Sequence, residues 1–432
     1  MDQVRVADLP AGFVIAHRGG SLQAPENTLE AHRVAVAQGV LVVEQDVQVL
    51  ADGALGVMHD GTVDRTTSSS GNVAEHTAAS WGRLRIDAGT WLGGGWGDLR
   101  PPLFEQVLEE FGHRVLLCPE AKPPGTMAPL LDVLERAGTS PEAVLVQSFS
   151  RRECQEAVAR GWQALWLGVT DPAGAAADGI AWIGVAASAL TPALCQDARA
   201  AGVRVSAYTV DRQRPWERLR SWGVDACFSD DPAYLLAPAG RPSRDAFADQ
   251  RWAPGMQADG DGSGRRGRFF PDGSFGFDED SAPASSVLLG GLGPPGAGAG
   301  AGAGTVALDV RVRVEAGADA GRDGAALLLL STTDEPPELA DGYLFLLHRS
   351  GRLAVQQVRD GVATTLAEGA TAAPAPGAYV PLTVTASPAG VSFGCTDGAG
   401  RVVVDGADGG GLGYLHVGQR DSAARFRDVV FR

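Results

Sequence analysis

The first half of the chain alternates short apolar runs with helical patterns. The apolar runs occur at residues 13–17, 41–47, 55–58, 114–118, 143–147, 163–168, 181–185, 203–208 and 225–229. Helical patterns separate most of them, at residues 27–38, 103–112, 127–137, 150–159, 191–201 and 213–222. Apolar strands that alternate with helices indicate a parallel sheet. If residues 41–47 and 55–58 count as one pair, eight repeats over about 225 residues predict a (β/α)8 TIM barrel.

The alternation stops between residue 61 and about residue 102, where Ser, Thr, Gly and Trp dominate. An irregular insertion of about 40 residues is unusually long for a loop, and such loops commonly act as lids or substrate walls. Three tryptophans lie in it, Trp81, Trp91 and Trp96. We expect the insertion to border a site, with these rings as a potential apolar entrance.

The pattern changes again after Leu236. We predict a barrel domain at residues 1–238, a linker at 239–250 and a second domain at 251–432. Beyond the linker the helical period disappears, and short alternating runs separated by turn residues are typical of an antiparallel β-sandwich. The segments DGYLFLLHRSGRLAVQQVRDG and RFRDVVF resemble concanavalin-like or laminin-G-like jelly rolls. That resemblance implies a possible glycan ligand for the second domain.

Charge and cysteine usage exclude several classes of protein. The net charge of −16 argues against nucleic acid and against attachment to anionic lipid, because both require clustered cations. The five cysteines are scattered without a CxxC pair, so neither a disulfide framework nor a zinc site is indicated. No signal peptide and no transmembrane run of about 18 apolar residues is visible. We therefore expect a cytoplasmic protein, or a secreted one if the chain has been trimmed.

Polar residues with useful chemistry stand at the ends of the predicted strands. Glu44 and Asp46 lie two residues apart on one strand, so their carboxylates share a face. His17 and His59 end two other strands. The carboxyl ends of barrel strands carry the chemistry of this fold. Paired histidines and carboxylates there are suited to acid–base catalysis around a hard metal ion.

The only lysine of the chain, Lys122, follows another predicted strand. All other basic residues among the 36 Lys plus Arg are arginines. A single lysine in so arginine-rich a chain indicates a need for a compact ammonium group rather than a planar guanidinium. Glu120 precedes it by two residues and adds a third carboxylate. An all-oxygen ligand set favours Mg²⁺ or Ca²⁺ over zinc.

Several motifs occur in a fixed order: HRGG at 17–20, PENT at 25–28, EQD at 44–46, HD at 59–60 and VDRTT at 63–67. Together they resemble the N-terminal part of the glycerophosphodiester phosphodiesterases. Glu120-Ala121-Lys122 fits the Glu-x-Lys pattern of that family. The resemblance implies metal-dependent hydrolysis of glycerophosphodiesters to an alcohol and glycerol 3-phosphate.

The same resemblance implies roles for individual residues. It makes His17 and His59 the general acid and base. It makes Glu44, Asp46 and Glu120 the ligands of one divalent metal. It places Arg18 and Lys122 on the phosphate. Tyr208, which stands where the family more often has Trp, is expected to line the glycerol or the alcohol pocket.

Several points stay open at the level of sequence. Which histidine is the base, whether the substrate's own hydroxyl attacks first, the alcohol moiety, the metal and the oligomeric state are not determined. The alternatives are a phospholipase D or sphingomyelinase D of the same barrel family and a carbohydrate-binding protein with an inactive barrel. Asn27 and Asp230 are expected to cap helices, since each stands at a predicted helix start. Ser148 and Phe149 either face the phosphate or pack at the barrel rim.

Overall fold

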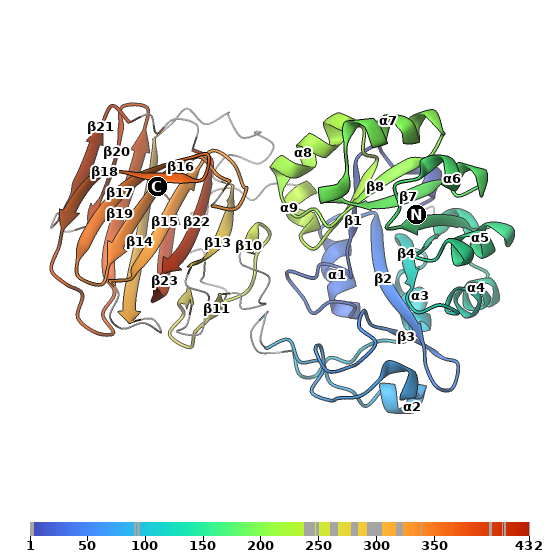
Figure 1. Ribbon diagram of the computed structural model, residues 1–432. Helices are drawn as coiled ribbons and strands as arrows, with labels where there is room; N and C mark the ends of the chain where they lie inside the picture. The colour runs from blue at the N-terminus through green and yellow to red at the C-terminus, as the bar shows by residue number, and fades with distance from the viewer. Residues whose placement is uncertain are drawn as a thin grey trace. The chain divides into compact units, whose positions relative to one another are not determined.

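The computed structural model divides into two compact units, a first that ends at Leu236 and a second that holds the described residues after it (Figure 1). It describes residues 4–89, 92, 96–236, 247, 250–259, 267–277, 284–291, 305–316, 323–337, 339–396, 400–407, 409 and 412–431. Most of the predicted linker 239–250 and Trp91 of the insertion lie outside these residues.

A closed barrel of parallel strands forms the first unit. Its eight strands are β1 (Phe13–Ala16), β2 (Val42–Val49), β4 (Leu116–Ala121), β5 (Leu145–Ser148), β6 (Gln163–Leu167), β7 (Trp182–Ala186), β8 (Arg204–Tyr208) and β9 (Ala226–Ser229). β1 pairs with both β2 and β9, which closes the sheet. β3 (Leu55–Val57) adds to β2 in antiparallel orientation. The predicted (β/α)8 barrel is confirmed.

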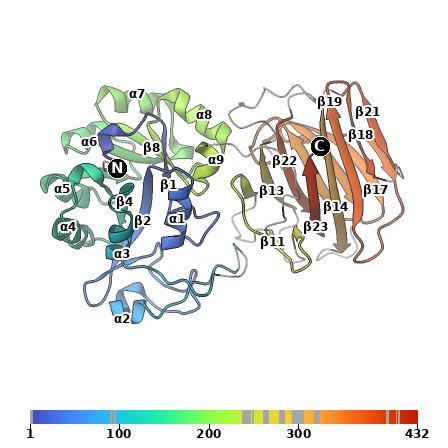
Figure 2. The ribbon, with the colours of Figure 1, turned by 180° about the vertical axis from the view of Figure 1, so that it is seen from behind.

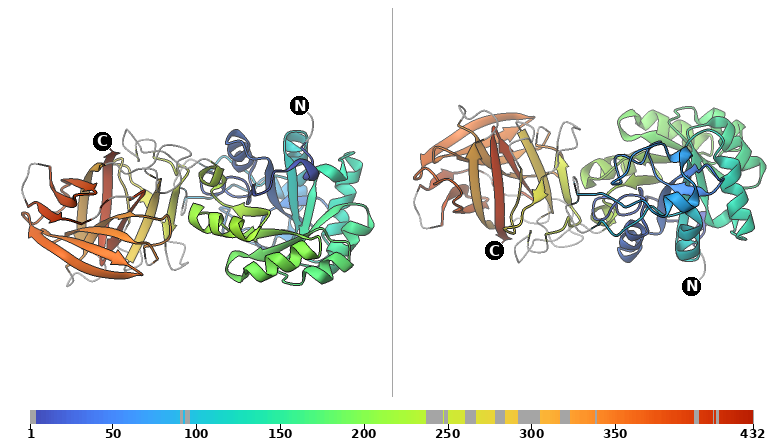
Figure 3. Two further views of the ribbon diagram at one scale, coloured as in Figure 1. Left: turned by 90° about the horizontal axis from the view of Figure 1, so that it is seen from above. Right: turned by 90° about the horizontal axis from the view of Figure 1, so that it is seen from below.

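Helices surround the barrel, as the views from behind and from above show (Figures 2 and 3). They are α1 (Leu29–Ala37), α3 (Phe104–Phe111), α4 (Met127–Arg136), α5 (Arg151–Ala159), α6 (Pro172–Ala177), α7 (Pro192–Ala200), α8 (Gln213–Trp222) and α9 (Pro232–Leu236). In α3 the apolar positions three and four residues apart are all buried. The outer faces of the strands pack on such helical faces in one continuous core.

The inner faces of the strands form a second core inside the barrel, which includes Ile15, Val42, Leu116 and Cys118. Side chains alternate between the two faces of a strand. Glu44 and Asp46 follow Val42 by two and four positions, and Glu120 follows Leu116 by four. These three predicted metal ligands therefore point into the barrel near its carboxyl end.

The insertion folds into a small layer with a core of its own. It contains a 3₁₀ turn at Val73–Glu75 and the short helix α2 (Ala78–Trp81). Trp81 is 0% exposed, and its Nε1 donates a hydrogen bond to the carbonyl oxygen of Pro102 at 3.1 Å. The expectation that Trp81 lines an apolar entrance is therefore wrong, because its ring fills the core of the insertion.

The described residues of the second unit form two seven-stranded antiparallel sheets. One has the order β10 (Met256–Asp259), β13 (Ala284–Gly291), β22 (Tyr414–Arg420), β15 (Ala325–Ser331), β16 (Gly342–His348), β17 (Arg352–Arg359) and β18 (Val362–Ala370). The other has the order β11 (Arg268–Phe269), β12 (Phe275–Gly276), β23 (Ser422–Phe431), β14 (Val306–Ala316), β19 (Val380–Ser387), β20 (Gly390–Cys395) and β21 (Val402–Asp405).

The two sheets meet through buried side chains, as where the rings of Phe345 and Phe393 lie 5.7 Å apart between centroids. The predicted antiparallel β-rich second half is confirmed. Its likeness to concanavalin or laminin-G domains, and a glycan ligand, stay predictions.

A buried histidine in α1 makes stability depend on pH. Burial lowers the pKa of His32 to about 4 although its Nδ1 lies 2.6 Å from the carbonyl oxygen of Thr28. The unfolded chain takes up this proton near its ordinary value of 6.5, so the folded state loses up to about 3 kcal/mol as pH falls from 6.5 to 4. We expect His32→Leu to show a weaker loss of unfolding free energy over this range than wild type. The exposed His113→Leu variant is the control, and equal acid sensitivity of all three proteins would contradict the assignment.

Candidate active site

A tight turn after β1 brings Arg18 to the end of the barrel. Arg18 has φ 56° and Gly19 has φ 87°, both in the left-handed region. A Cβ on Gly19 would lie 2.7 Å from the Cβ of Ala31, so only glycine fits this close approach to α1. The turn directs the backbone N–H of Arg18 to Oε2 of Glu44, 2.7 Å away.

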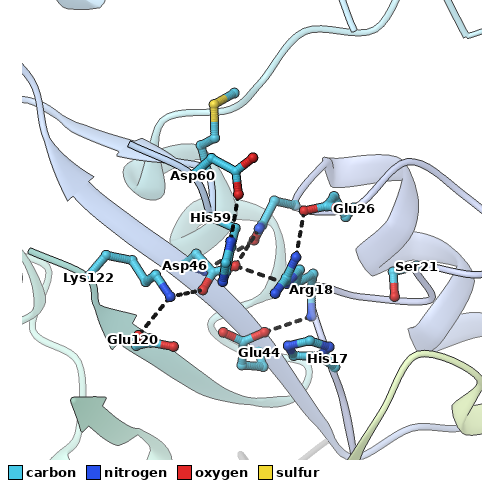
Figure 4. Close-up of polar contacts among 12 residues, drawn as sticks. His17, Arg18, Ser21, Glu26, Glu44, Asp46, His59, Asp60, Glu120 and Lys122 are labelled. Carbon is cyan, nitrogen blue, oxygen red and sulfur yellow. Dashed lines mark hydrogen bonds and ion pairs between the residues drawn. The ribbon is translucent and has the colours of Figure 1, made fainter. Parts of the chain in front are cut away.

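Three buried carboxylates converge at this end of the barrel (Figure 4). Glu44 and Asp46 lie on β2, and Glu120 on β4 is the direct cross-strand partner of Asp46. One oxygen from each of the three lies within 4.8 Å of the others. Glu44 and Asp46 are 1% exposed and Glu120 is 7% exposed. The structure thus brings the three predicted ligands together, and β4 stays paired through Pro119.

Two cationic side chains approach the same carboxylates. Lys122 Nζ lies 2.9 Å from Glu120 Oε1 and 3.4 Å from Asp46 Oδ1. Arg18 Nε lies 3.3 Å from Asp46 Oδ2. A compact ammonium fits between two carboxylates on neighbouring strands, which is a physical reason for a lysine at this position.

The carboxylates outnumber the cations, and their pKa values show it. Burial and then the charge of Asp46 raise the pKa of Glu44 to about 8. Burial and then Asp46 also raise the pKa of Glu120 to about 7, although Lys122 opposes this. Burial disfavours the charged form of Asp46 as well, but Arg18 and Lys122 hold its pKa below the ordinary value. The site is short of positive charge, and its all-oxygen donor set fits a hard divalent cation.

The two predicted histidines are held by different carboxylates. His17 Nδ1 lies 2.7 Å from Asp230 Oδ1. Burial opposes protonation of His17, but the charge and hydrogen bond of Asp230 raise its pKa to about 9. His59 Nδ1 lies 2.7 Å from Asp60 Oδ1, yet burial lowers its pKa. At neutral pH His17 is therefore cationic and His59 neutral.

Two residues that we expected to cap helices support the site instead. Thr28 caps α1, since its Oγ1 accepts a hydrogen bond from Ala31 N at 3.1 Å. Asn27 donates from Nδ2 to Asp46 Oδ2 at 2.7 Å and accepts from Asp46 N at 3.1 Å. Asp230 holds His17. Asp230 follows β9 directly, so it stands at the same end of the barrel as the other site residues. This strand-end position could have indicated its role from the sequence.

A pocket of about 240 Å³ opens beside these groups. His17, Arg18, Glu44, His59, Glu120 and Lys122 line its polar side. Phe149, Leu167, Tyr208 and Phe228 line the other. The rings of Phe149 and Tyr208 meet edge to face, 6.2 Å apart between centroids. Tyr208 is thus one of the predicted site residues that line this pocket. The pocket is small compared with the roughly 300–1,000 Å³ of sites for drug-sized ligands.

Ser148, the neighbour of Phe149, is not among the residues that line the pocket. Its hydroxyl donates to Glu153 Oε2 at 2.7 Å, so it supports the start of α5 rather than the pocket. Gln147, which we did not single out from sequence, lines the pocket and donates to Glu44 Oε1 at 3.4 Å. Among the described residues no helix is both long and apolar enough to cross a membrane.

The first half of the chain is similar to known proteins. The chain is 32% identical over 237 residues to a glycerophosphodiester phosphodiesterase of Caldanaerobacter subterraneus, covering 52% of this chain and 96% of that protein. It is 30% identical over 250 residues to a glycerophosphodiester phosphodiesterase of Bacillus subtilis, covering 51% of this chain and 84% of that protein.

Among solved structures, an Oleispira antarctica phosphodiesterase in complex with the product sn-glycerol 3-phosphate is 29% identical. The match has a TM-score of 0.48 and covers 52% of this chain and 96% of that one. The model of the glycerophosphoryl diester phosphodiesterase family matches residues 17–234, about half of the chain. The chain therefore belongs to the glycerophosphoryl diester phosphodiesterase family and is a phosphodiesterase.

Proposed function

We propose that the first unit hydrolyses small glycerophosphodiesters to an alcohol and glycerol 3-phosphate with the help of one divalent cation. The observation that carries the proposal is a group of three buried carboxylates that lack matching positive charge. They lie beside a pocket that is also lined by two histidines, one with a raised pKa and one with a lowered pKa. Such a site can bind an anion, activate a nucleophile and protonate a leaving group.

Glu44, Asp46 and Glu120 would hold Mg²⁺ or Ca²⁺, because both ions take carboxylate oxygens as ligands. When bound, such an ion supplies positive charge beside the phosphoryl oxygens. Asn27 fixes the orientation of Asp46 through two hydrogen bonds. Arg18 and Lys122 reach the pocket and provide fixed positive charge for the phosphate.

The opposite directions of the two pKa shifts support different proton transfers for the two histidines. Neutral His59 accepts the proton of the attacking water through Nε2, because Nδ1 faces Asp60. Cationic His17 donates its Nε2 proton to the leaving alcohol oxygen, because Nδ1 faces Asp230. The bond from water oxygen to phosphorus forms while the bond from phosphorus to the alcohol oxygen breaks. The products are the alcohol and glycerol 3-phosphate.

A substrate panel tests this choice against the lipase-like alternative. We expect glycerophosphocholine to be cleaved with a kcat/KM at least ~100-fold above that of lysophosphatidylcholine or sphingomyelin, since a pocket of about 240 Å³ matches a small phosphodiester better than a lipid. Release of glycerol 3-phosphate and of choline is measured by coupled assays. Equal or faster release of choline from lysophosphatidylcholine would instead assign a phospholipase D-like activity.

A further inference from the structure

One arginine of the insertion joins the surroundings of two active-site residues. Arg65 donates from Nε to Asp60 Oδ2 at 2.6 Å and from Nη2 to Asp60 Oδ1 at 3.1 Å. The same side chain donates from Nη1 to Glu26 Oε2 at 2.7 Å and from Nη2 to Glu26 Oε1 at 2.8 Å. Both carboxylates are thus held in two-point contacts, the strongest geometry available to a guanidinium.

Each of these carboxylates holds an active-site side chain in turn. Asp60 Oδ1 lies 2.7 Å from Nδ1 of His59. Glu26 Oε1 accepts from Nη1 of Arg18 at 2.8 Å. A continuous chain of contacts therefore runs from His59 through Asp60, Arg65 and Glu26 to Arg18. Figure 4 shows its two ends, the contact of His59 with Asp60 and that of Arg18 with Glu26.

We propose that Arg65 is a positioning residue that fixes the ring of His59 and the guanidinium of Arg18 relative to one another. In this way the insertion holds the side chains of His59 and Arg18, which lie on different segments of the chain, in fixed positions. This inference rests on the proposed function of His59 and Arg18.

The physical argument lies in what each carboxylate would do without Arg65. The side chain of Asp60 is partly exposed and stands in the loop after β3, and its carboxylate is held by Arg65 on one side and contacts His59 on the other. The hydrogen bond from Arg65 also lowers the pKa of Asp60 to about 2. Glu26 freed from Arg65 would compete more strongly for Arg18 and withdraw its charge from the phosphate. A lysine supplies one ammonium in place of the planar fork and cannot hold both carboxylates in the same way.

The experiment compares Arg65→Ala and Arg65→Lys with wild type and with Arg85→Ala, a matched control in the same insertion whose side chain donates only to backbone carbonyl oxygens in the structure described. With glycerophosphocholine as substrate we expect kcat of Arg65→Ala to fall by ~50-fold and KM to change by less than ~5-fold, as for loss of orientation. Arg65→Lys should recover only part of kcat. Guanidinium chloride in the millimolar range should partly restore Arg65→Ala and leave Arg85→Ala unchanged.

A spectroscopic measurement separates positioning from folding. In ¹⁵N-histidine spectra, assigned with His59→Gln, we expect the Nδ1–H tautomer for His59 in wild type and a tautomer mixture in Arg65→Ala. If Arg65→Ala does not fold, Arg65→Gln takes its place. A kcat within ~2-fold of wild type, or an unchanged His59 tautomer, would overturn the inference. If wild type releases no glycerol 3-phosphate, the proposed function fails, while the tautomer measurement still decides the effect of Arg65 on His59.

Discussion

The His59→Gln variant should hydrolyse glycerophosphocholine roughly 10²–10⁴-fold more slowly than wild type, the range expected for loss of a general base. His17→Gln should lose a similar factor, because the alcohol then leaves without a proton donor. Both rings line the pocket with Nδ1 bound to a carboxylate, which leaves Nε2 for the substrate. His113→Gln, at an exposed position, should keep full activity. A His59→Gln variant as active as wild type would remove His59 from the chemistry.

The partner of His17 provides a test of its protonation state. A proton donor must be protonated, so activity is present below its pKa and is lost as pH rises through that value. Asp230 is the main group that raises the pKa of His17, with Glu44 adding to the effect and Arg18 opposing it. In Asp230→Asn the basic limb of the kcat/KM profile should therefore move to lower pH. A limb that stays in place or moves upward would show that His17 is not the donor.

Isosteric changes at the carboxylate trio should abolish metal-dependent activity. In Glu44→Gln, Asp46→Asn and Glu120→Gln we expect apparent affinity for Mg²⁺ or Ca²⁺ to fall by more than the ~10–100-fold that supporting residues alone contribute. Asp46→Asn should be the most severe, because Asp46 is also the partner of Lys122 and Arg18. Glu110→Gln, which removes a peripheral carboxylate paired with Arg33, is the matched control.

The Glu44→Gln variant should lose activity but not stability in the absence of metal. In the metal-free protein Glu44 carries a raised pKa because it is buried beside another carboxylate. Burying a carboxyl that is ionised in the unfolded chain therefore costs free energy, and Glu44→Gln removes this cost, so its melting temperature without metal should equal or exceed that of wild type. Added metal should then raise the melting temperature of wild type and not of Glu44→Gln. A large loss of stability in metal-free Glu44→Gln would contradict the account of an electrostatically strained site.

Much of the barrel and its site could be predicted because the relevant signals are local. The period of two along β2 puts Glu44 and Asp46 on one face, and the strand-end positions of His17 and His59 place them at the same rim. Lys122 was recognisable because it is the only lysine.

The residues that sequence reasoning misjudged act across long separations. Asp230 meets His17 across 213 positions, and Asn27 meets Asp46 across 19. Their local sequences look like helix caps, and only closure of the barrel shows which partner each takes. Trp81 was misread for a related reason, since composition does not tell whether an aromatic ring faces a pocket or fills a core.

The central claim is that the carboxylate trio binds a divalent cation on which hydrolysis depends, and a metal titration tests it most directly. Chelator-treated wild type is titrated with Mg²⁺ and with Ca²⁺ while binding and release of glycerol 3-phosphate from glycerophosphocholine are followed together. We expect one ion per chain for the activating metal, a rate that rises in proportion to occupancy, and no activation in Asp46→Asn. Full hydrolysis by the metal-free enzyme, with no change on addition of either ion, would contradict the account.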